Sequence, residues 1–257
     1  TARKQAEEAL RNSEERFHQI FELAPDGYYL ADLKGNFLDG NRASEQMIGF
    51  PKEELIGKNF LKIGVLPLDQ IPKAAAMLAK TILGKPAGPE ELTLIRKDKS
   101  QVEIEIRVHP SMINKQRVLL GIARDITARK QAEEALIKLK KAVDTSTEAI
   151  FLTDLEGIFT YINPGFTALY GYSAGEVIGK VTPRILKSGF LNPQVYVKFW
   201  KTLLSGQEVK GELMNRRKNG KLIDIEGSAT PILDDAKKIV GFLGIQHDIT
   251  ERKQVEA

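Results

Sequence analysis

The sequence contains no cysteine, one tryptophan and three histidines among its 257 residues. Without cysteine there is no disulfide, no thiolate nucleophile, and no cysteine-ligated zinc, iron–sulfur or c-type haem site. No apolar run approaches the roughly 20 residues that a membrane-spanning helix needs, and the first residues lack a signal-peptide pattern. We therefore expect a cytoplasmic segment that makes no membrane contact of its own, which leaves room for an anchor elsewhere in the parent protein.

Neither sign of charge dominates, because 38 lysines and arginines stand against 34 aspartates and glutamates. The basic residues gather in two short runs, 96–99 (RKDK) and 215–221 (NRRKNGK), each beside a predicted hairpin turn. No aromatic residues are interleaved with these runs. We interpret both runs as solvated turns and expect no nucleic-acid partner.

The strongest feature that is present is an internal repeat. The ten residues TARKQAEEAL occur at 1–10 and again at 127–136, and a looser copy, TERKQVEA, occupies 250–257. The interval is that of an ordinary domain, not of a solenoid unit. Two similar domains thus lie between three similar connectors, and connectors at both ends lead us to expect an excerpt from a longer array.

The two domains align phrase by phrase, with DLKGNF and ELIGK of the first matching DLEGIF and EVIGK of the second. Each predicts two short strands around a D-x-x-G turn, then short helices, one longer helix and three strands. In the first domain the two short strands are predicted at 27–33 and 36–39, a short helix begins at Pro51 and the long helix spans 68–83. In the second domain the strands are predicted at 149–154 and 158–162, a short helix begins at Ser173 and the long helix spans 192–205.

One strand of the first domain shows which face is buried. Val102, Ile104, Ile106 and Val108 alternate with charged or polar residues, so they share one face. This pattern predicts an α+β fold in which each domain is a five-stranded antiparallel sheet with helices on one face, and an α-helical linker joins the two.

The order of these elements and their recurring phrases resemble the PAS family of sensory domains, and an Asp-Ile-Thr triplet closes both domains. The resemblance implies a tandem PAS fragment of a sensor histidine kinase. The expected parts are a connector (1–12), PAS domain one (13–126), a linker helix (127–146), PAS domain two (147–249) and the start of a further connector (250–257).

Domain two has less bulk than domain one on the wall that should line its interior. Ile106 and Val108 of the first domain correspond to Gly227 and Ala229 of the second. The change predicts space inside domain two, and a better packed domain one that serves as a relay or dimerisation module.

Two carboxamides accompany the lost bulk, because Leu94 becomes Asn215 and Ala123 becomes Gln246. A buried amide without a partner costs about 1–3 kcal/mol, so these side chains need each other, water or a ligand. We expect a small-molecule pocket in domain two. The alternative is that either side chain turns into solvent through a strand bulge.

A carboxamide presents a donor and an acceptor side by side, which matches the edge of a heterocycle. The segments around Asn215, Trp200 and 244–248 (GIQHD) resemble flavin-binding PAS domains. The resemblance implies that Asn215 and Gln246 would contact the ring of FAD or FMN, with Trp200 and Arg184 supporting it. Adduct photochemistry is excluded, because it needs a cysteine.

No metal site is expected. Haem-binding PAS domains place a histidine on or beside the long helix, and neither long helix contains one. The three histidines, His18, His109 and His247, are predicted to face outward.

The Asp-Ile-Thr triplets stand where a strand passes into a connector helix. Asp125 and Thr127, and likewise Asp248 and Thr250, have short oxygen-bearing side chains that can cap free helix N–H groups. The resemblance adds that this junction couples strand strain to helix position, which makes the four residues candidates for signal relay.

The linker carries a narrow apolar stripe that includes Leu136, Leu139 and Val143. The stripe either contributes to a homodimer through a coiled coil or covers the neighbouring sheet, and both readings stay open.

No motif for catalysis is present: there is no P-loop, nucleophile elbow or kinase nucleotide box. We expect a non-enzymatic sensory module that binds a small molecule and relays the signal through linker helices. The alternative is a pair of ligand-free spacers that set dimer geometry.

Overall fold

The computed structural model describes residues 2–190 and 192–256, so Thr1 and Ala257, the ends of the predicted connectors, lie outside it. The chain divides into two compact units, residues 1–134 and 135–257. None of the helices in the described ranges is long and apolar enough to cross a membrane.

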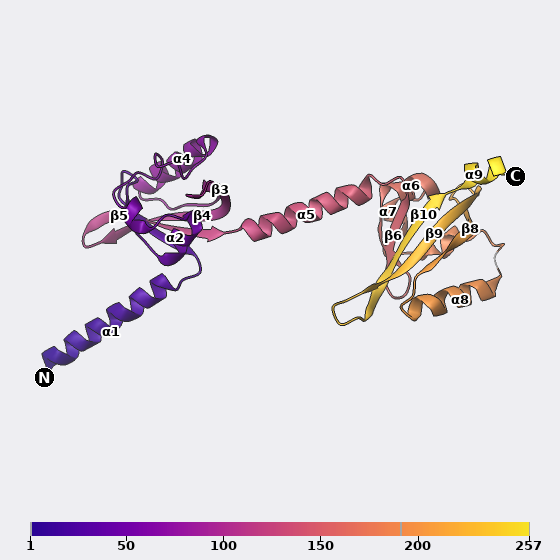
Figure 1. Cartoon of the computed structure of the whole chain (residues 1–257), viewed down its shortest axis with the longest axis horizontal. Helices are drawn as coiled ribbons and strands as arrows, with labels where there is room; N and C mark the ends of the chain where they lie inside the picture. Colours follow the sequence, from indigo (N-terminus) through magenta and orange to yellow (C-terminus); the bar gives the residue numbers. More distant parts are fainter. Residues whose placement is uncertain (1, 191, 257) are drawn as a thin grey trace. The chain divides into compact units, whose positions relative to one another are not determined.

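Domain one is built on a five-stranded antiparallel sheet with the strand order β2-β1-β5-β4-β3 (Figure 1). The alternation on β4 has the predicted consequence, because Val102 and Ile104 are fully buried while Glu103 between them is partly exposed. The strands are β1 (Gly27–Ala31), β2 (Phe37–Gly40), β3 (Ala87–Ile95), β4 (Gln101–Ile113) and β5 (Gln116–Asp125).

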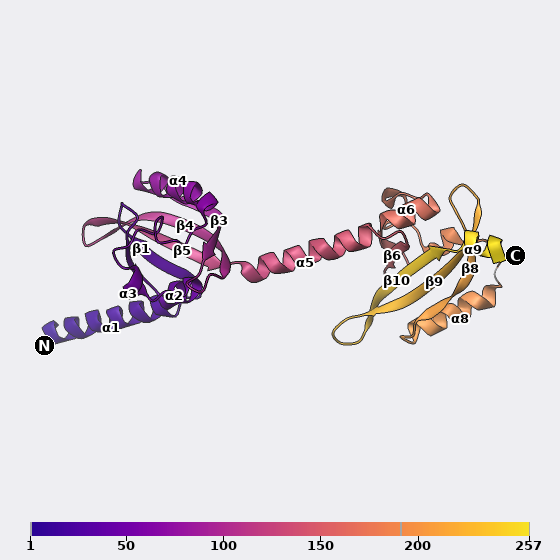
Figure 2. The same ribbon diagram turned by 45° about the horizontal axis from the view of Figure 1, so that its top comes forward.

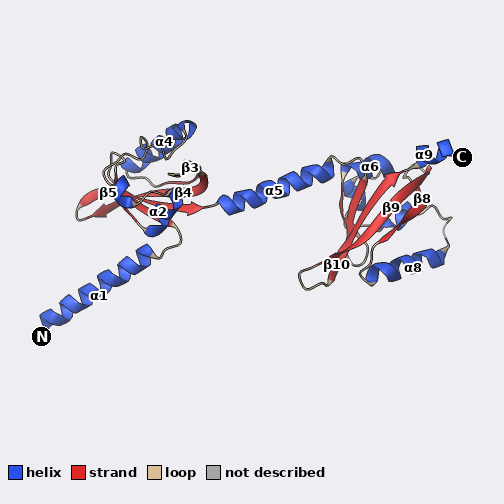
Figure 3. Cartoon of the chain, in the orientation of Figure 1, coloured by secondary structure: helices blue, strands red, loops and turns tan. Residues whose placement is uncertain are grey.

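Domain two repeats this topology with the order β7-β6-β10-β9-β8 (Figure 2). Its strands are β6 (Ala149–Thr153), β7 (Phe159–Ile162), β8 (Val209–Arg216), β9 (Leu222–Leu233) and β10 (Ile239–Asp248). Two five-stranded antiparallel sheets with helices confirm the predicted fold class (Figure 3).

Short helices and one longer helix pack against each sheet and enclose an apolar core, whereas the connector helices, α1 (Ala2–Glu22) and α5 (Thr127–Asp144), are exposed along most of their length. In domain one the packed helices are α2 (Arg42–Ile48), α3 (Lys52–Leu55), η1 (Leu68–Gln70) and α4 (Ile71–Ile82). The later helices are α6 (Pro164–Tyr170), α7 (Ala174–Val177), η2 (Pro183–Leu186), α8 (Pro193–Leu204) and α9 (Thr250–Glu256). The predicted boundary between the first connector (1–12) and domain one (13–126) falls inside α1, which is continuous to Glu22.

The predicted helix 68–83 differs from the structure at its start. A 3₁₀ turn over Leu68–Gln70 precedes the α-helix, which begins at Ile71. Pro72 has no N–H to donate to the carbonyl of Leu68, so an α-helix cannot run continuously through this point. The predicted starts at Pro51 and Ser173 are the N-cap residues of α3 and α7.

The two D-x-x-G phrases form turns, as their composition predicts. Asp32 Oδ1 accepts from the backbone N–H groups of Lys34 and Asn36, both at 2.8 Å. Gly35 closes the turn with φ at 82°, a conformation that favours glycine. These aspartates therefore shape the hairpin between the first two strands.

Candidate functional site

The reduced wall of domain two borders a cavity of about 570 Å³ beside β8, β9 and β10. Gly211 and Gly227 face each other across β8 and β9, so the wall has no side chain at either position. All six predicted site residues line this cavity: Arg184 on η2, Trp200 on α8, Asn215 on β8, Gly227 and Ala229 on β9, and Gln246 on β10.

The two carboxamides meet at one hydroxyl group. Asn215 Nδ2 donates to the Tyr170 hydroxyl over 2.8 Å, and that hydroxyl donates to Gln246 Oε1. Asn215 is buried and Gln246 is half-buried, so neither has turned out into solvent. Within the described part of the chain, these bonds leave Asn215 Oδ1 and Gln246 Nε2 available to a ligand in the cavity.

Tyr170 is the residue that sequence reasoning missed. It is fully buried at the end of α6, and its burial raises the pKa of the hydroxyl, which therefore stays neutral and can both donate and accept. Comparing the two domains could have identified it, because the position of domain one that aligns with Tyr170 holds an apolar residue, Ile48.

Domain one has apolar residues where domain two has this polar group. Ile48, Leu94 and Ala123 stand at the three matching positions. With Ile106 and Val108 also filling the wall, the cavity of domain one is only about 100 Å³. Three positions distant in sequence thus become polar together, in the domain that has the larger cavity.

Aromatic and basic side chains surround the outer part of the larger cavity. Trp200 packs edge-to-face on Phe242 of β10 at 5.4 Å between ring centroids. Arg184 is exposed on η2, and Lys187 Nζ lies 3.5 Å from the ring centroid of Tyr196. The cavity therefore joins a polar, uncharged inner end to a charged rim, in which Glu156, Glu208 and Glu212 stand among the basic residues.

The three histidines are all exposed and do not line the cavity. His109 and His247 occupy the outer face of their strands, as their alternation predicts.

At the first strand-to-helix junction, Asp125 Oδ1 accepts from Thr127 N over 2.8 Å. Thr127 Oγ1 in turn accepts from the backbone N–H of Glu103 on β4 over 3.0 Å. Ile126, between them, is buried and donates its N–H to the carbonyl of Glu103. The triplet therefore fastens the start of α5 to β4.

The second junction repeats this arrangement. Asp248 Oδ1 accepts from Thr250 N over 2.9 Å, and Thr250 Oγ1 accepts from Asp224 N on β9 over 3.1 Å. Burial alone would raise the pKa of Asp248, but hydrogen bonds from Thr250 and from Arg217 together lower it. The four predicted relay residues thus occupy equivalent places in the two domains.

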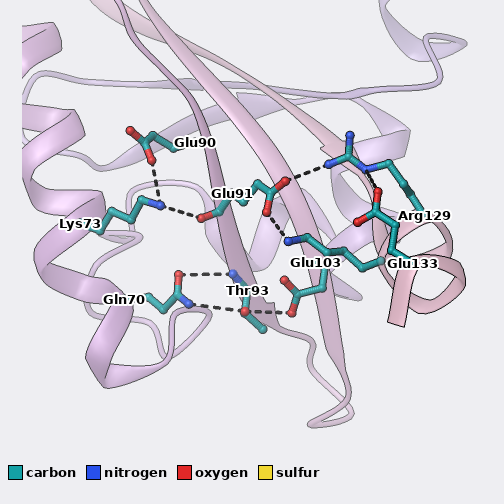
Figure 4. Close-up of polar contacts among 9 residues, drawn as sticks. Gln70, Lys73, Glu90, Glu91, Thr93, Glu103, Arg129 and Glu133 are labelled. Atoms are coloured by element: carbon teal, nitrogen blue, oxygen red, sulfur yellow. Dashed lines mark hydrogen bonds and ion pairs between the residues drawn. The ribbon is translucent and has the colours of Figure 1, made fainter. Parts of the chain in front are cut away.

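Ion pairs hold the first turn of each connector helix to the outer face of its sheet. Glu91 of β3 pairs with Lys130 of α5 and with Arg129 of the same helix, whose Nη2 lies at 2.9 Å. Figure 4 shows the pair with Arg129. Lys73 of α4 pairs with Glu90 at 2.8 Å and donates to the Glu91 carbonyl, which brings α4 into the same network. Hydrogen bonding from Lys130 lowers the pKa of Glu91.

Domain two has the same clamp, in which Glu212 pairs with Arg252 and Lys253, each at 2.9 Å. The arginine and lysine belong to the repeated connector phrase, and their carboxylate partner lies on a distant strand. The sequence therefore shows the repeated connector phrase, but it does not show the ion pairs that the phrase forms with Glu91 and Glu212.

A buried asparagine fastens each domain to the helix that precedes it. Asn163 Nδ2 donates to the carbonyls of Val143 on α5 and Glu148, while its Oδ1 accepts from Ile150 N and Phe166 N. Asn41 makes the equivalent four bonds in domain one. Sequence reasoning missed this pair, although an asparagine at the same place in both domains was a signal.

Comparison with known proteins agrees with this architecture. A model of the PAS domain matches residues 25–128 and 147–251. The nitrogen fixation regulatory protein of Klebsiella pneumoniae is 33% identical over 108 residues, which are 42% of this chain and 22% of that protein. The oxygen sensor protein DosP of Escherichia coli (strain K12) is 23% identical over 248 residues, 90% of this chain and 31% of that protein.

Among solved structures, the PAS domain of a protein from Colwellia psychrerythraea is 32% identical, with a TM-score of 0.40, and covers 46% of this chain and 99% of that one. Light-oxygen-voltage domains also match. The chain spans less than a third of the two curated relatives named above. Because the family model covers most of the sequence in two successive matches, the chain belongs to the PAS domain family and contains two PAS domains.

Proposed function

We propose that this chain is the sensory part of a signalling protein and that domain two binds a small heterocyclic ligand. The observation that carries the proposal is the Tyr170–Asn215–Gln246 group at the inner end of a cavity of about 570 Å³. A site with an apolar wall and a few convergent polar groups is typical of small-molecule binding.

The free atoms of the group define the ligand. Asn215 Oδ1 is an acceptor and Gln246 Nε2 is a donor, so the ligand should carry a complementary donor and acceptor on its inner edge. The rim residues Arg184 and Lys187 suit an anionic tail. A flavin nucleotide, FAD or FMN, meets both requirements and is the specific ligand that we propose.

The parent protein that we propose is a sensor histidine kinase, in which this fragment acts as a homodimer without catalytic chemistry, nucleic acid or membrane contact of its own. Exposed apolar residues on the connector helices, among them Leu136 and Leu139 on α5, support dimer formation. A change in ligand binding would be transmitted to the connector helices α5 and α9 through the strand-to-helix junctions at Asp125 and Asp248.

The first test is native mass spectrometry of the freshly purified chain with a denatured control and a visible absorption scan. A released mass with flavin absorbance would support the proposal. FMN is then titrated into ligand-free protein, with the fluorescence of Trp200, the only tryptophan, as the readout.

The variant Asn215→Leu should weaken FMN binding at least tenfold, because it removes the acceptor that faces the ligand. Asn12→Leu, the same change at an exposed position of α1, should bind as the wild type does. Unchanged binding by Asn215→Leu would remove the role assigned to Asn215. Absence of both bound mass and FMN binding would favour the ligand-free spacer.

A further inference from the structure

One buried donor in domain two lacks a partner. Arg217, directly after β8, donates from Nη2 to Asp248 Oδ2 over 2.8 Å, and both side chains are half-buried. Arg217 Nε is fully buried, and in the described part of the chain it is the one such side-chain nitrogen or oxygen atom that forms no hydrogen bond. A buried donor without a partner is unfavourable, and more so on a charged group. This arginine is therefore incompletely satisfied in its present position.

The matching arginine of domain one has a different set of partners. Arg96 Nε donates to the backbone carbonyl of Met47, in the last turn of α2, over 2.9 Å. Its Nη2 lies 3.6 Å from Asp125 Oδ2, which is too long for a hydrogen bond. The residue of domain two that corresponds to Met47 is Leu169 of α6. One arginine thus binds the helix and pairs loosely with the junction aspartate, whereas the other pairs tightly and leaves its Nε unpaired.

The two arrangements accompany different interiors. In domain one, where the arginine binds the helix, branched side chains such as Ile106 and Val108 leave a cavity of only about 100 Å³. In domain two, where Arg217 Nε is unpaired, the cavity is about 570 Å³. A ligand in this cavity would make the interior of domain two as full as that of domain one. A filled interior should therefore favour the helix-bound arginine.

The end of α6 connects the cavity to the arginine. Tyr170, its last residue, bonds the two carboxamides of the cavity through its hydroxyl, and its carbonyl accepts from Lys218 N over 2.9 Å. Leu169 precedes Tyr170, and Arg217 precedes Lys218. Burial is the main cause of the raised pKa of the Tyr170 hydroxyl, and the charges of Asp248 and Arg217 act on this pKa in opposite directions. A shift of Tyr170 would thus move the Leu169 carbonyl relative to the arginine.

We propose that Arg217 is a two-state switch that couples the filling of the cavity to the connector helix α9. With the cavity empty, Arg217 pairs with Asp248. When the cavity is filled, its Nε donates to the carbonyl of Leu169 and the pair with Asp248 lengthens, as in domain one. Operation of the switch by a ligand rests on the proposed function, whereas the two arrangements of the arginine do not.

The pair with Asp248 bears directly on the start of α9. Asp248 Oδ1 accepts from Thr250 N over 2.9 Å, while its Oδ2 accepts from Arg217. A longer pair removes one constraint on this carboxylate, so the first turn of α9 should open more often. Arginine suits the switch because its planar fork has separate donors for two acceptors, whereas lysine carries its donors on one nitrogen atom.

The first test measures exchange of the Thr250 amide with water by NMR, in the whole chain with and without FMN. FMN should speed this exchange about two- to fivefold, the range expected for the loss of a partly exposed ion pair. Arg217→Lys should bind FMN as the wild type does, because Arg217 does not line the cavity, and should show no FMN-dependent change in exchange. Arg96→Lys is the same substitution in domain one and should respond as the wild type does.

The second test needs no ligand. Gly227→Ile combined with Ala229→Val places the side chains of domain one on the wall of domain two, and should speed Thr250 exchange without FMN. Adding Arg217→Lys should cancel this increase. A Cβ at Gly227 would lie 3.0 Å from a side-chain carbon of Ile225. Ala229→Val alone leaves this glycine unchanged and should shift the exchange in the same direction by a smaller factor.

Three results would overturn the switch. The first is FMN binding that leaves Thr250 exchange unchanged in the wild type. The second is an FMN-dependent change in Arg217→Lys that equals that of the wild type. The third is unchanged exchange in both cavity-filling variants. If FMN does not bind the wild type, the proposed ligand fails, and faster exchange in the cavity-filling variants would still support the switch. The two proposals can therefore fail independently.

Discussion

Asn215 Nδ2 donates to the hydroxyl of Tyr170 over 2.8 Å, which joins β8 to the end of α6. The same hydroxyl donates to Gln246 on β10, so one oxygen atom serves two carboxamides. Tyr170 and Asn215 are buried, so each would be a buried polar group without a partner if the other two residues were apolar. The three residues therefore form one unit, which can be tested as a unit.

The variant Tyr170→Phe should destabilise domain two by about 1–3 kcal/mol. It removes the acceptor that lies 2.8 Å from the buried Asn215 Nδ2 and leaves only Gln246 Oε1, at 3.5 Å. The cost of a poorly satisfied buried group approaches this size. Urea unfolding followed by Trp200 fluorescence reports on domain two alone, since this is the only tryptophan.

The matched control converts all three residues to those of domain one: Tyr170→Ile, Asn215→Leu and Gln246→Ala. This triple variant should recover most of the lost stability, because replacing all partners by apolar groups leaves none unsatisfied. Equal loss in the single and triple variants would mean that the hydroxyl acts by packing alone.

Asn163→Ala should lower the free energy of unfolding of domain two by about 3 kcal/mol or more. Asn163 is buried and makes four hydrogen bonds to backbone groups, each of which costs about 1–3 kcal/mol when left unpaired in the interior. Hydrogen exchange should also become faster at the C-terminal end of α5. Asn12→Ala, on the exposed face of α1, is the control and should change neither quantity. A loss below 1 kcal/mol would show that water replaces these bonds.

The junction at Asp248 should weaken in acid. Its pKa is lowered in the folded protein, so its contribution to stability is complete above the unfolded value of about 3.9 and is lost as the pH falls through the lower, folded value. Asp248→Asn should therefore be less stable than the wild type at pH 7, and the difference should disappear near pH 2. Urea unfolding across this pH range measures it, with Asp235→Asn in the exposed β9–β10 turn as the control. A difference that persists at pH 2 would argue against the ionised carboxylate as its source.

Glu91→Gln should loosen the first turn of α5 with little effect on the fold, because its ion pairs with Arg129 and Lys130 are half exposed. Amide exchange in this turn should accelerate, and the effect should shrink as salt is added. Glu134→Gln removes the same charge from the exposed surface of α5 and should leave exchange unchanged. Identical exchange in wild type and Glu91→Gln at low salt would show that the clamp does not hold the helix.

Much of the architecture followed from periodicity and self-comparison. The alternation of Val102, Ile104, Ile106 and Val108 identified the buried face of β4, and the repeated phrases showed that the same fold occurs twice. Hydrophobic alternation is a local property, so it can be recognised in the sequence of one strand without knowing its partner strands. Four of the six cavity residues, Asn215, Gly227, Ala229 and Gln246, could be named because two aligned domains reveal which wall positions differ. The other two, Trp200 and Arg184, came from the resemblance to flavin-binding PAS domains.

The sequence by itself determined the two-domain α+β plan, the smaller side chains on the wall of domain two and the Asp-Ile-Thr junctions, because each depends on residue type and spacing along the chain. The tertiary structure alone decided that Tyr170 is shared by Asn215 and Gln246 and that Glu91 and Glu212 form ion pairs with the basic residues of the connector helices. These are contacts between segments far apart in sequence, and their geometry exists only once sheet register and helix packing have brought the atoms together.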